Sequence, residues 1–300
     1  MTLPKPDTQL THGFINGNHW PYNITFMKAI VYTKYGPPDV LKLEEVQKPT
    51  SGDNEVLVKV HAASVNPLDW HALRGTPFMH RLSGAGLLKP KNKILGADVA
   101  GQVEAAAVPQ GAITALHCLR DKGQVQPGQK VLVNGASGGV GVFAVQIAKS
   151  YGTEVTGVCS TRNLDLVRSI GADQVIDYTK EDFTRNGQHY DLIIDNVGNR
   201  SVSDYKRALS PNGIFVLVGF SMSLLLHFTF LGPWISMTGS KKMSALIPKE
   251  NREDLVLIKE LLETGKVVPV IDRSYPLSEV AEAIRYLEEG HAQGKVVITL

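Results

Sequence analysis

Residues 130–149, KVLVNGASGGVGVFAVQIAK, constrain the fold of this chain more than any other segment. An apolar β-branched run over 131–133 ends in a glycine-rich turn, and an apolar pattern with helical spacing follows at once. Strand, glycine turn and helix in this order are typical of a dinucleotide-binding unit. Gly138 would let a diphosphate approach the backbone, and Gly141 would let the helix pack closely on its strand. Ala136 replaces the first glycine of the usual fingerprint, so a tight turn without a ligand stays the alternative.

The backbone amides at the start of this helix are the expected diphosphate ligands. They have no partner within the helix, and they lie at the positive end of its dipole. The residues predicted to bind the cofactor here are Ser137, Gly138, Gly139, Val140 and Gly141.

The segment 154–160 predicts the second strand of the same unit. NAD-binding units usually carry Asp or Glu at the end of this strand, where it binds the ribose hydroxyls. This chain has Ser160, Thr161 and Arg162 there, and no carboxylate that would repel a 2′-phosphate. A guanidinium and two hydroxyls favour phosphate binding. The sequence therefore predicts NADPH as the cofactor, with a solvated loop arginine as the alternative for Arg162.

The composition is that of a globular chain with balanced charge. The length of 300 residues suggests about two domains, and a hydrophobic share of 43% is normal for a buried core. Lys and Arg number 31 against 29 Asp and Glu, which excludes an electrostatic nucleic-acid binder. Cys118 and Cys159 are far apart in the sequence, so we expect a reducing compartment, no disulfide framework and no zinc site.

The remaining pattern predicts an α/β chain. Residues 1–26 are polar and are expected to form an N-terminal appendage, and 27–104 are interpreted as an all-β unit with strands at 28–32, 40–46, 55–65 and 97–105. A helix at 108–119 leads into alternating strands and helices up to about residue 243, the pattern of a doubly wound parallel sheet. Its expected strands are 130–134, 154–159, 174–177, 191–197 and 213–219, and its helices lie near 140–150, 162–170 and 201–209. Further helices at 252–264 and 281–290 precede a closing strand at 295–300.

No segment has the pattern of a signal peptide or a membrane span, so the sequence predicts a cytoplasmic protein. The most apolar stretch, 224–237, is too short to cross a bilayer. A buried helix or a subunit contact is favoured over a membrane-surface patch.

Eight stretches carry a family resemblance, and they occur in the family's order. They are 62–70 (AASVNPLDW), 96–101 (GADVAG), 134–141 (NGASGGVG), 159–163 (CSTRN), 171–178 (GADQVIDY), 190–198 (YDLIIDNVG), 209–219 (LSPNGIFVLVG) and 294–300 (GKVVITL). The chain resembles the zinc-free quinone oxidoreductase and enone reductase branch of the medium-chain dehydrogenase/reductase superfamily.

This resemblance implies a GroES-like substrate domain at 27–115, completed by 266–300, and a Rossmann domain at 116–265. It also implies NADPH-dependent hydride transfer to a small quinone or α,β-unsaturated carbonyl, and a homodimer formed through the edge of the Rossmann sheet. Zinc-dependent relatives carry Cys and His near the positions of Asn66 and Ala97, so a zinc-independent reaction is expected here.

The resemblance also implies further site residues. Asn66 and Thr114 would lie near the nicotinamide, Asp69 and Trp70 at the substrate mouth, and Tyr178 beside the adenosine phosphate. Asn66, Asp69 and Thr114 are the catalytic candidates among them. The nicotinamide side would be lined by Asn196, Val197, Gly219 and Phe220. Each of these residues also has an ordinary packing or capping role as its alternative, and no dedicated general acid is evident.

The chain departs from the family pattern at one point. Glu104 runs almost directly into 105–109 (AAAVP), where the family has several more strands. The first domain is therefore expected to be shortened. An NADPH-binding relative with impaired catalysis stays open as an alternative, and a zinc-free alcohol dehydrogenase or other carbonyl reductase is a third.

Overall fold

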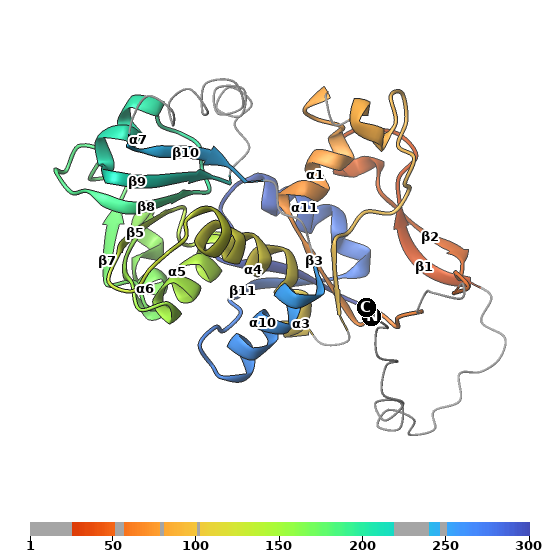
Figure 1. The fold of residues 1–300 in the computed structure, drawn as a ribbon. Coiled ribbons are helices and arrows are strands. Elements are labelled where there is room, and N and C mark those ends of the chain that lie inside the picture. Colours follow the sequence, from red (N-terminus) through yellow and green to blue (C-terminus); the bar gives the residue numbers. More distant parts are fainter. Residues whose placement is uncertain (1–25, 52–56, 79–80, 101–102, 219–239, 247–250) are drawn as a thin grey trace, which may run out of the picture.

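The computed structural model describes residues 26–51, 57–78, 81–100, 103–218, 240–246 and 251–300. Two lobes are visible, a larger one built on a parallel sheet and a smaller one that carries β1, β2 and α1 (Figure 1). Helix α4 of the larger lobe and strand β11 of the smaller one lie near the centre of the molecule, where the two lobes meet (Figure 1). The predicted residues Gly219 and Phe220 and the apolar stretch 224–237 lie outside the described residues.

The larger lobe is built on a six-stranded, entirely parallel sheet with the order β10-β9-β8-β5-β6-β7. Its strands are β5 (Lys130–Asn134), β6 (Glu154–Cys159), β7 (Gln174–Asp177), β8 (Tyr190–Asp195), β9 (Leu209–Leu217) and β10 (Lys242–Ala245). From β5 the strands β6 and β7 are added on one side of the sheet, and β8, β9 and β10 on the other. The order of strands therefore reverses between β5 and β8, which is the switch point where such sheets bind ligands. The predicted doubly wound sheet is confirmed.

Helices cover both faces of this sheet, which explains why its strands are continuous apolar runs. Val131, Leu132 and Val133 of β5 are all completely buried. The helices are α4 (Pro109–Leu116), α5 (Gly141–Ser150), α6 (Leu164–Ser169), α7 (Val202–Ala208) and α10 (Arg252–Glu263), with short helical turns η3 (His117–Lys122) and η4 (Thr161–Asn163). The helix at 108–119 and that at 252–264 therefore form nearly where the sequence predicts them.

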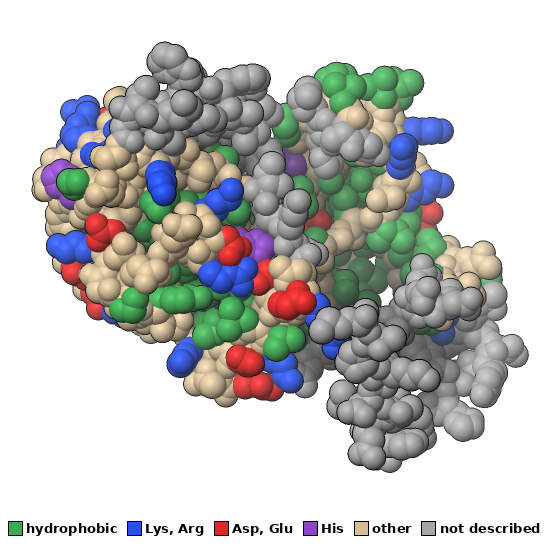
Figure 2. All heavy atoms as spheres, in the orientation of Figure 1, with side chains coloured by type: hydrophobic (Ala, Val, Ile, Leu, Met, Phe, Trp, Pro, Cys, Tyr) green, Lys and Arg blue, Asp and Glu red, His purple; other side chains and the backbone are tan. Residues whose placement is uncertain are grey.

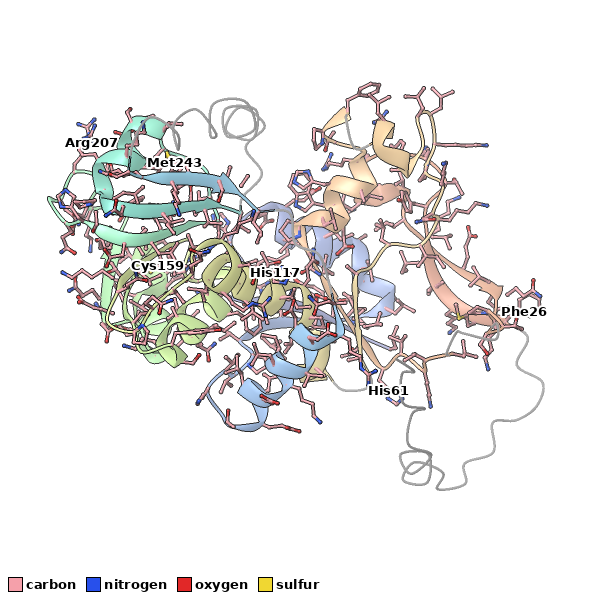
Figure 3. The ribbon with its side chains drawn as sticks, in the orientation of Figure 1. Phe26, His61, His117, Cys159, Arg207 and Met243 are labelled. Carbon is pink, nitrogen blue, oxygen red and sulfur yellow. The ribbon has the colours of Figure 1, made fainter. Side chains whose placement is uncertain are left out.

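A buried ion cluster joins α10 to the end of α4. His117 Nε2 lies 2.6 Å from Asp254 Oδ2, and Arg120 donates to the other carboxylate oxygen at 2.6 Å (Figure 3). Asn251 caps α10 and also donates to Asp254. These bonds hold the pKa of Asp254 below its usual value against the opposing effect of burial.

The smaller lobe contains a four-stranded sheet with the order β11-β12-β3-β4 and a separate antiparallel pair, β1 and β2. Its strands are β1 (Phe26–Val31), β2 (Lys42–Gln47), β3 (Ala62–Val65), β4 (Asp98–Ala100), β11 (Ile271–Pro276) and β12 (Lys295–Thr299). Strand β12 lies between β11 and β3, so the last strand of the chain completes the sheet that begins near residue 62.

The helical elements of this lobe are α1 (Pro67–Arg74), α3 (Val103–Ala106), α11 (Val280–Glu288), η1 (Pro38–Val40), η2 (Arg81–Ala85) and η5 (Leu277–Glu279). The prediction of an all-β unit over 27–104 was therefore wrong. Asn66, Pro67 and Asp69 form the capping box and proline start of α1, a helix signal that the strand interpretation overlooked.

Two expected strands are also shorter than predicted. Among the described residues of 55–65, only Ala62–Val65 is a strand, and the strand predicted at 97–105 is confined to Asp98–Ala100. Residues Val103–Ala106 form a helix instead, since glutamate and alanine, which make up three of its four residues, have high helix propensity.

The four-stranded sheet ends at the three-residue strand β4. Val99 on this strand is 50% exposed, and Leu88 on the same lobe is 88% exposed. Figure 2 shows hydrophobic side chains at the surface of this lobe, whereas acidic and basic side chains are interspersed over the larger one. Within the described ranges, no helix is long and apolar enough to cross a membrane. Exposed apolar surface and a short edge strand are what a shortened β domain would produce.

Candidate nucleotide and substrate site

The glycine turn follows β5, and its glycines meet two different requirements. A Cβ on Gly141 would lie 2.1 Å from the carbonyl oxygen of Gly135, so only glycine fits where α5 packs against the turn. A Cβ on Gly138 would find its nearest protein neighbour at 3.5 Å. The protein therefore leaves room beside Gly138, and this is the position where a diphosphate would approach the backbone.

The strand ends beside the turn are fixed by Asp195, which is completely buried at the end of β8. Its carboxylate accepts hydrogen bonds from Asn134 Nδ2 at 2.8 Å, from the amide of Val197 at 3.1 Å and from the hydroxyl of Tyr205. Burial raises the pKa of Tyr205, so this hydroxyl stays protonated and donates.

Asn196 follows Asp195 and carries an unused acceptor. Its Nδ2 donates to the carbonyl of Asn134 at 3.1 Å, but its buried Oδ1 has no hydrogen-bond partner among the residues that the structure describes. Val197 beside it is 46% exposed. An unpaired amide oxygen at the switch point fits a ligand that donates hydrogen bonds, as the carboxamide of a nicotinamide does.

The end of β6 differs from the sequence interpretation. Thr161 donates its hydroxyl hydrogen to Asp177 Oδ2 at 2.6 Å, and Asp177 ends the adjacent strand β7, in register with Cys159. The expectation that no carboxylate lies here was wrong. Asp177 is distant in sequence and reaches the end of β6 only because β7 pairs with β6. Tyr178 is 54% exposed. Ser160 is half-buried.

A segment of the C-terminal chain, residues 291–295, is bonded to the glycine turn. The amide of Gly294 donates to the carbonyl of Ser137 at 2.8 Å. Asn163 links the two parts, because it donates to Ser137 Oγ at 2.8 Å and accepts from Gln293 at 2.6 Å. Arg162 donates to the carbonyl of His291 at 2.7 Å. The ends of β5 and β6 are thereby joined to the strand that enters the smaller lobe.

Lys295 is a buried cation at this junction, and the sequence analysis missed it. The residue is 2% exposed, and a Cβ on Gly139 would lie 3.3 Å from its Cδ. Its Nζ donates to Asn66 Oδ1 at 2.5 Å and lies 3.4 Å from Asp98 Oδ2. Burial lowers the pKa of Lys295, and Asp98 opposes that effect. A lysine opening an otherwise apolar strand after Gly294 was the available signal.

Of the catalytic candidates Asn66, Asp69 and Thr114, Asn66 bonds directly to Asp98, whereas Thr114 is linked to Asp98 only through Gln110. Asp98 Oδ2 accepts from Asn66 Nδ2 at 3.0 Å and from Ser64 at 2.7 Å, whereas Oδ1 accepts from the amide of Gln110 at 2.9 Å. Thr114 lies one turn further along α4 and donates to the carbonyl of Gln110 at 2.6 Å. A substrate-side strand, the start of α4 and the last strand therefore share one buried polar network.

Asp69 supports this network from the smaller lobe. The residue is 6% exposed, and its carboxylate accepts from the amide of Asn66 at 2.8 Å. Burial raises the pKa of Asp69 to about 6, and the nearby Asp98 raises it further while the bond from Asn66 opposes the shift. Trp70 stacks on His71 with their ring centroids 3.7 Å apart. In this geometry Asp69 caps α1 and fixes the backbone of Asn66 at the start of that helix.

Neither position that zinc-dependent relatives use for metal ligands carries a ligating group. The amide of Asn66 is bonded to Asp98 and Lys295, and Ala97 has no ligating atom. Across the described residues, no group of three or more His, Cys, Asp or Glu side chains could hold a metal ion.

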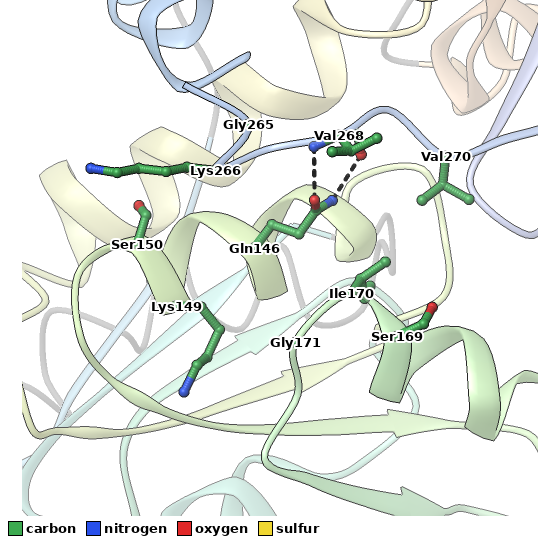
Figure 4. Close-up of a pocket in the computed structure, with 10 residues that line it drawn as sticks. All are labelled: Gln146, Lys149, Ser150, Ser169, Ile170, Gly171, Gly265, Lys266, Val268 and Val270. Atoms are coloured by element: carbon green, nitrogen blue, oxygen red, sulfur yellow. Dashed lines mark hydrogen bonds between the residues drawn. The ribbon is translucent and has the colours of Figure 1, made fainter. Parts of the chain in front are cut away.

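A cavity of about 780 Å³ lies elsewhere, at the far end of α5 (Figure 4). The C-terminal ends of α5, α6 and α10 approach it, and helix C-termini carry partial negative charge. Lys149 is already paired with Asp173 at 2.8 Å, which leaves Lys266 as the cation that offsets the charge of the helix ends, so this cavity is a poor match for an anionic nucleotide. The residues lining it are Gln146, Lys149, Ser150, Ser169, Ile170, Gly171, Gly265, Lys266, Val268 and Val270.

A parallel sheet with a glycine turn at its switch point and a second sheet closed by the last strand define a nucleotide-dependent dehydrogenase or reductase. Residues 52–162 match the alcohol dehydrogenase GroES-like domain, and residues 170–298 match the zinc-binding dehydrogenase family.

Comparisons with individual proteins indicate the same class of enzyme. A chloroplast envelope quinone oxidoreductase homolog of Arabidopsis thaliana is 30% identical over 326 residues, covering 91% of this chain and 98% of that protein. The 2-methylene-furan-3-one reductase of Solanum lycopersicum is 31% identical, covering 91% of this chain and 79% of that protein. The solved quinone oxidoreductase of Coxiella burnetii superposes with a TM-score of 0.77 at 28% identity, covering 92% and 99% of the two chains.

The chain therefore belongs to the medium-chain dehydrogenase/reductase superfamily, in its quinone oxidoreductase branch. Its fold is a Rossmann sheet with a smaller GroES-like part, and it is an oxidoreductase of a family that uses NAD(P) and small-molecule substrates.

Proposed function

We propose that this chain reduces quinones or α,β-unsaturated carbonyls with NADPH and without zinc. The observation that carries the proposal is the junction at Lys295, where the glycine turn, the last strand and Asn66 meet. A nucleotide lying across the switch point would have its diphosphate beside Gly138 and its nicotinamide toward Asn66 and Asn196. The printed names of the quinone and furanone reductases above support the substrate class.

The nucleotide side of the proposal uses three strand ends. Of the amides from Ser137 to Gly141, that of Gly138 already donates to the carbonyl of Gly135 at 3.2 Å, so the others would bind the diphosphate. The ammonium of Lys295 would add the positive charge that the turn itself lacks. Ser160, Thr161, Arg162 and Tyr178 surround the ribose at the end of β6. Arg162 uses one N–H for His291 and keeps its other donors for a 2′-phosphate.

On the substrate side, Asn66 is the group best placed to stabilise a developing oxyanion. Its Nδ2 carries two protons, and one of them is donated to Asp98 at 3.0 Å. The other has only 3.4 Å contacts to Ser64, so it is weakly engaged. The bound nucleotide supplies the hydride, and this second N–H would donate to the carbonyl oxygen as negative charge builds there. Solvent or a ribose hydroxyl supplies the proton.

The absence of metal ligands at Asn66 and Ala97 supports a zinc-independent reaction. Alcohol oxidation usually needs a Lewis acid to lower the pKa of the hydroxyl, whereas conjugate reduction of an enone or a quinone requires mainly positioning and an oxyanion donor. The domain boundaries at 115 and 265 and a homodimer through the sheet edge remain proposals of the same kind.

A direct test is NADPH oxidation by the purified chain with a panel of quinones and conjugated enones, with and without a metal chelator. We expect turnover that the chelator leaves unchanged. Loss of activity with the chelator, restored by added zinc, would contradict zinc independence, and the absence of turnover with every acceptor would contradict the reductase activity.

A catalytically impaired relative that binds NADPH is the second candidate. The alignment with the Arabidopsis protein spans 326 positions, although 91% of this 300-residue chain supplies only about 273 of them. The relative therefore contains segments that this chain lacks, and the short edge strand β4 lies where the expected ones are missing. Tight nucleotide binding without turnover would select this candidate.

A further inference from the structure

The ribose end of the proposed site contains a carboxylate that the mechanism above does not use. Asp177 ends β7 and is 8% exposed, with its side chain directed toward the end of β6. Both of its oxygens accept hydroxyl hydrogens, Oδ2 from Thr161 at 2.6 Å and Oδ1 from Thr179 at 2.7 Å. Hydrogen bonds from Thr161, and then from Thr179, lower the pKa of Asp177 to about 2. The group is therefore ionised at neutral pH.

These bonds decide what the two threonines can offer a ligand. A hydroxyl has one hydrogen, and each of these hydrogens is already donated to the carboxylate. Thr161 Oγ1 and Thr179 Oγ1 lie 3.2 Å apart. A ligand at this place therefore meets two hydroxyl oxygens that can accept hydrogen bonds but not donate them. A ribose 2′-hydroxyl can donate to such an acceptor, but a 2′-phosphate has only acceptor oxygens and gains nothing from it.

We propose that Asp177 is a specificity-determining residue, which makes this chain accept NADH alongside NADPH. The inference rests on the proposed function, because it assumes that the nucleotide ribose lies at the ends of β6 and β7. In many NAD-binding units the acidic residue ends the second strand itself. Here the third strand provides it, one position away in the sheet, since Asp177 pairs with Cys159.

Arg162 and Asp177 then act in opposite directions on the same phosphate. Arg162 attracts it, whereas Asp177 repels it and occupies the two hydroxyls that would otherwise donate to it. Lys180 Nζ lies 3.5 Å from Asp177 Oδ2, but the lysine side chain is 68% exposed. Solvent therefore weakens the neutralisation of the Asp177 charge by Lys180. The preference for NADPH over NADH is therefore small in the unaltered chain.

The test compares dissociation constants for NADPH and NADH, measured by titration calorimetry on the full chain. Asp177→Asn keeps the shape of the side chain and removes its charge. We expect the preference for NADPH to rise about tenfold, the effect of one charge on a dianion on the order of 6 Å away in water. Glu181→Gln is the matched control, because Glu181 carries the same charge on the same loop but bonds to Asn186 at 2.8 Å. Its preference should stay within about twofold of the unaltered chain.

Thr161→Val provides a second, independent variant. It removes an acceptor that only the ribose hydroxyl can use, so NADH binding should weaken about fivefold, the effect of one net hydrogen bond, while NADPH binding does not weaken. Binding of both nucleotides with an unchanged preference in Asp177→Asn would overturn this inference alone. A failure of the unaltered chain to bind either nucleotide would overturn the proposed function together with it.

Discussion

Lys295 is the buried cation of the candidate site, and we expect its loss to weaken nucleotide binding. Its side chain is buried with Cδ beside Gly139 of the glycine turn and Nζ bonded to Asn66, so we expect a diphosphate placed on the turn to gain a charge-assisted hydrogen bond from the ammonium. Lys295→Met should weaken nucleotide binding by about ten- to a hundredfold, since such bonds contribute about 1.5–3 kcal/mol. Fluorescence titration with NADPH measures this loss.

Lys266→Met is the control for that experiment. Lys266 lines the distant cavity at the end of α5 and carries the same charge. Nucleotide affinity should not change in this variant. Equal affinities of the Lys295 variant and the unaltered chain would show that the buried ammonium serves only its partners Asn66 and Asp98.

The raised pKa of Asp69 makes stability depend on pH in a defined direction. Because the folded-state pKa is about 6, above the usual value of 3.8, the folded chain keeps this proton where the unfolded chain has lost it. The free energy of unfolding therefore falls as pH rises between about pH 4 and pH 6. Asp69→Asn lacks this titration, so its stability relative to the unaltered chain should increase by about 2 kcal/mol over that window. Urea unfolding at several pH values tests this, and parallel stability curves would contradict it.

Sequence reasoning named candidate site residues where a local pattern suggests the role, and it missed candidates that only the fold brings to the site. Gly138 and Gly141 were assigned different roles from the turn alone, and the space around each agrees with those roles. Lys295 and Asp177 were missed because each reaches the site from a strand that is distant in sequence. Only the pairing of β12 with β3, and of β7 with β6, places them there.

At the scale of elements, the turn between β5 and α5 allows a paired test of its two glycines. Gly141→Ala places a Cβ 2.1 Å from the Gly135 carbonyl, which the backbone cannot accommodate without moving α5. We expect a loss of about 1–3 kcal/mol in unfolding free energy, as for an overpacked core. Gly138→Ala has its nearest protein contact at 3.5 Å, so it should fold normally and lose nucleotide affinity instead. Thermal unfolding and NADPH titration of both variants separate the two effects. Normal nucleotide affinity in Gly138→Ala would show that the diphosphate does not bind at this turn.

The strands of the larger sheet were predictable because a parallel sheet buried on both faces requires short apolar runs. The runs at 130–134, 154–159 and 174–177 have the predicted bounds in the structure. Strand β11 (Ile271–Pro276) was not predicted. Its sequence IDRSYP contains polar residues and lacks a buried face, and it forms a strand through pairing with β12. Such a strand is specified by its neighbour rather than by its own pattern.

At the scale of the whole molecule, the last strand couples the two lobes. Gly294 bonds to the glycine turn, Lys295 to Asn66, and Val296–Thr299 pair with β3 in the smaller sheet. The connector before β11 is fixed as well, because Gln146 donates to the carbonyl of Val268 at 3.0 Å and accepts from its amide at 2.8 Å (Figure 4). Ligand binding to the larger lobe should therefore stabilise strands of the smaller one.

Hydrogen exchange with and without NADPH tests this coupling. At a nucleotide concentration of about 100 times Kd, binding adds about 2.7 kcal/mol to the folded state, which slows exchange through coupled opening by about a hundredfold. We expect slower exchange at 135–142, and also at Lys295–Thr299 and Ala62–Val65. Lys295→Met should reduce the protection of β3 more than that of the glycine turn, because it removes the bond to Asn66 but leaves the Gly294 bond in place. Protection confined to 130–165 would mean that the two lobes open independently, and that nucleotide binding to the larger lobe does not organise the substrate side.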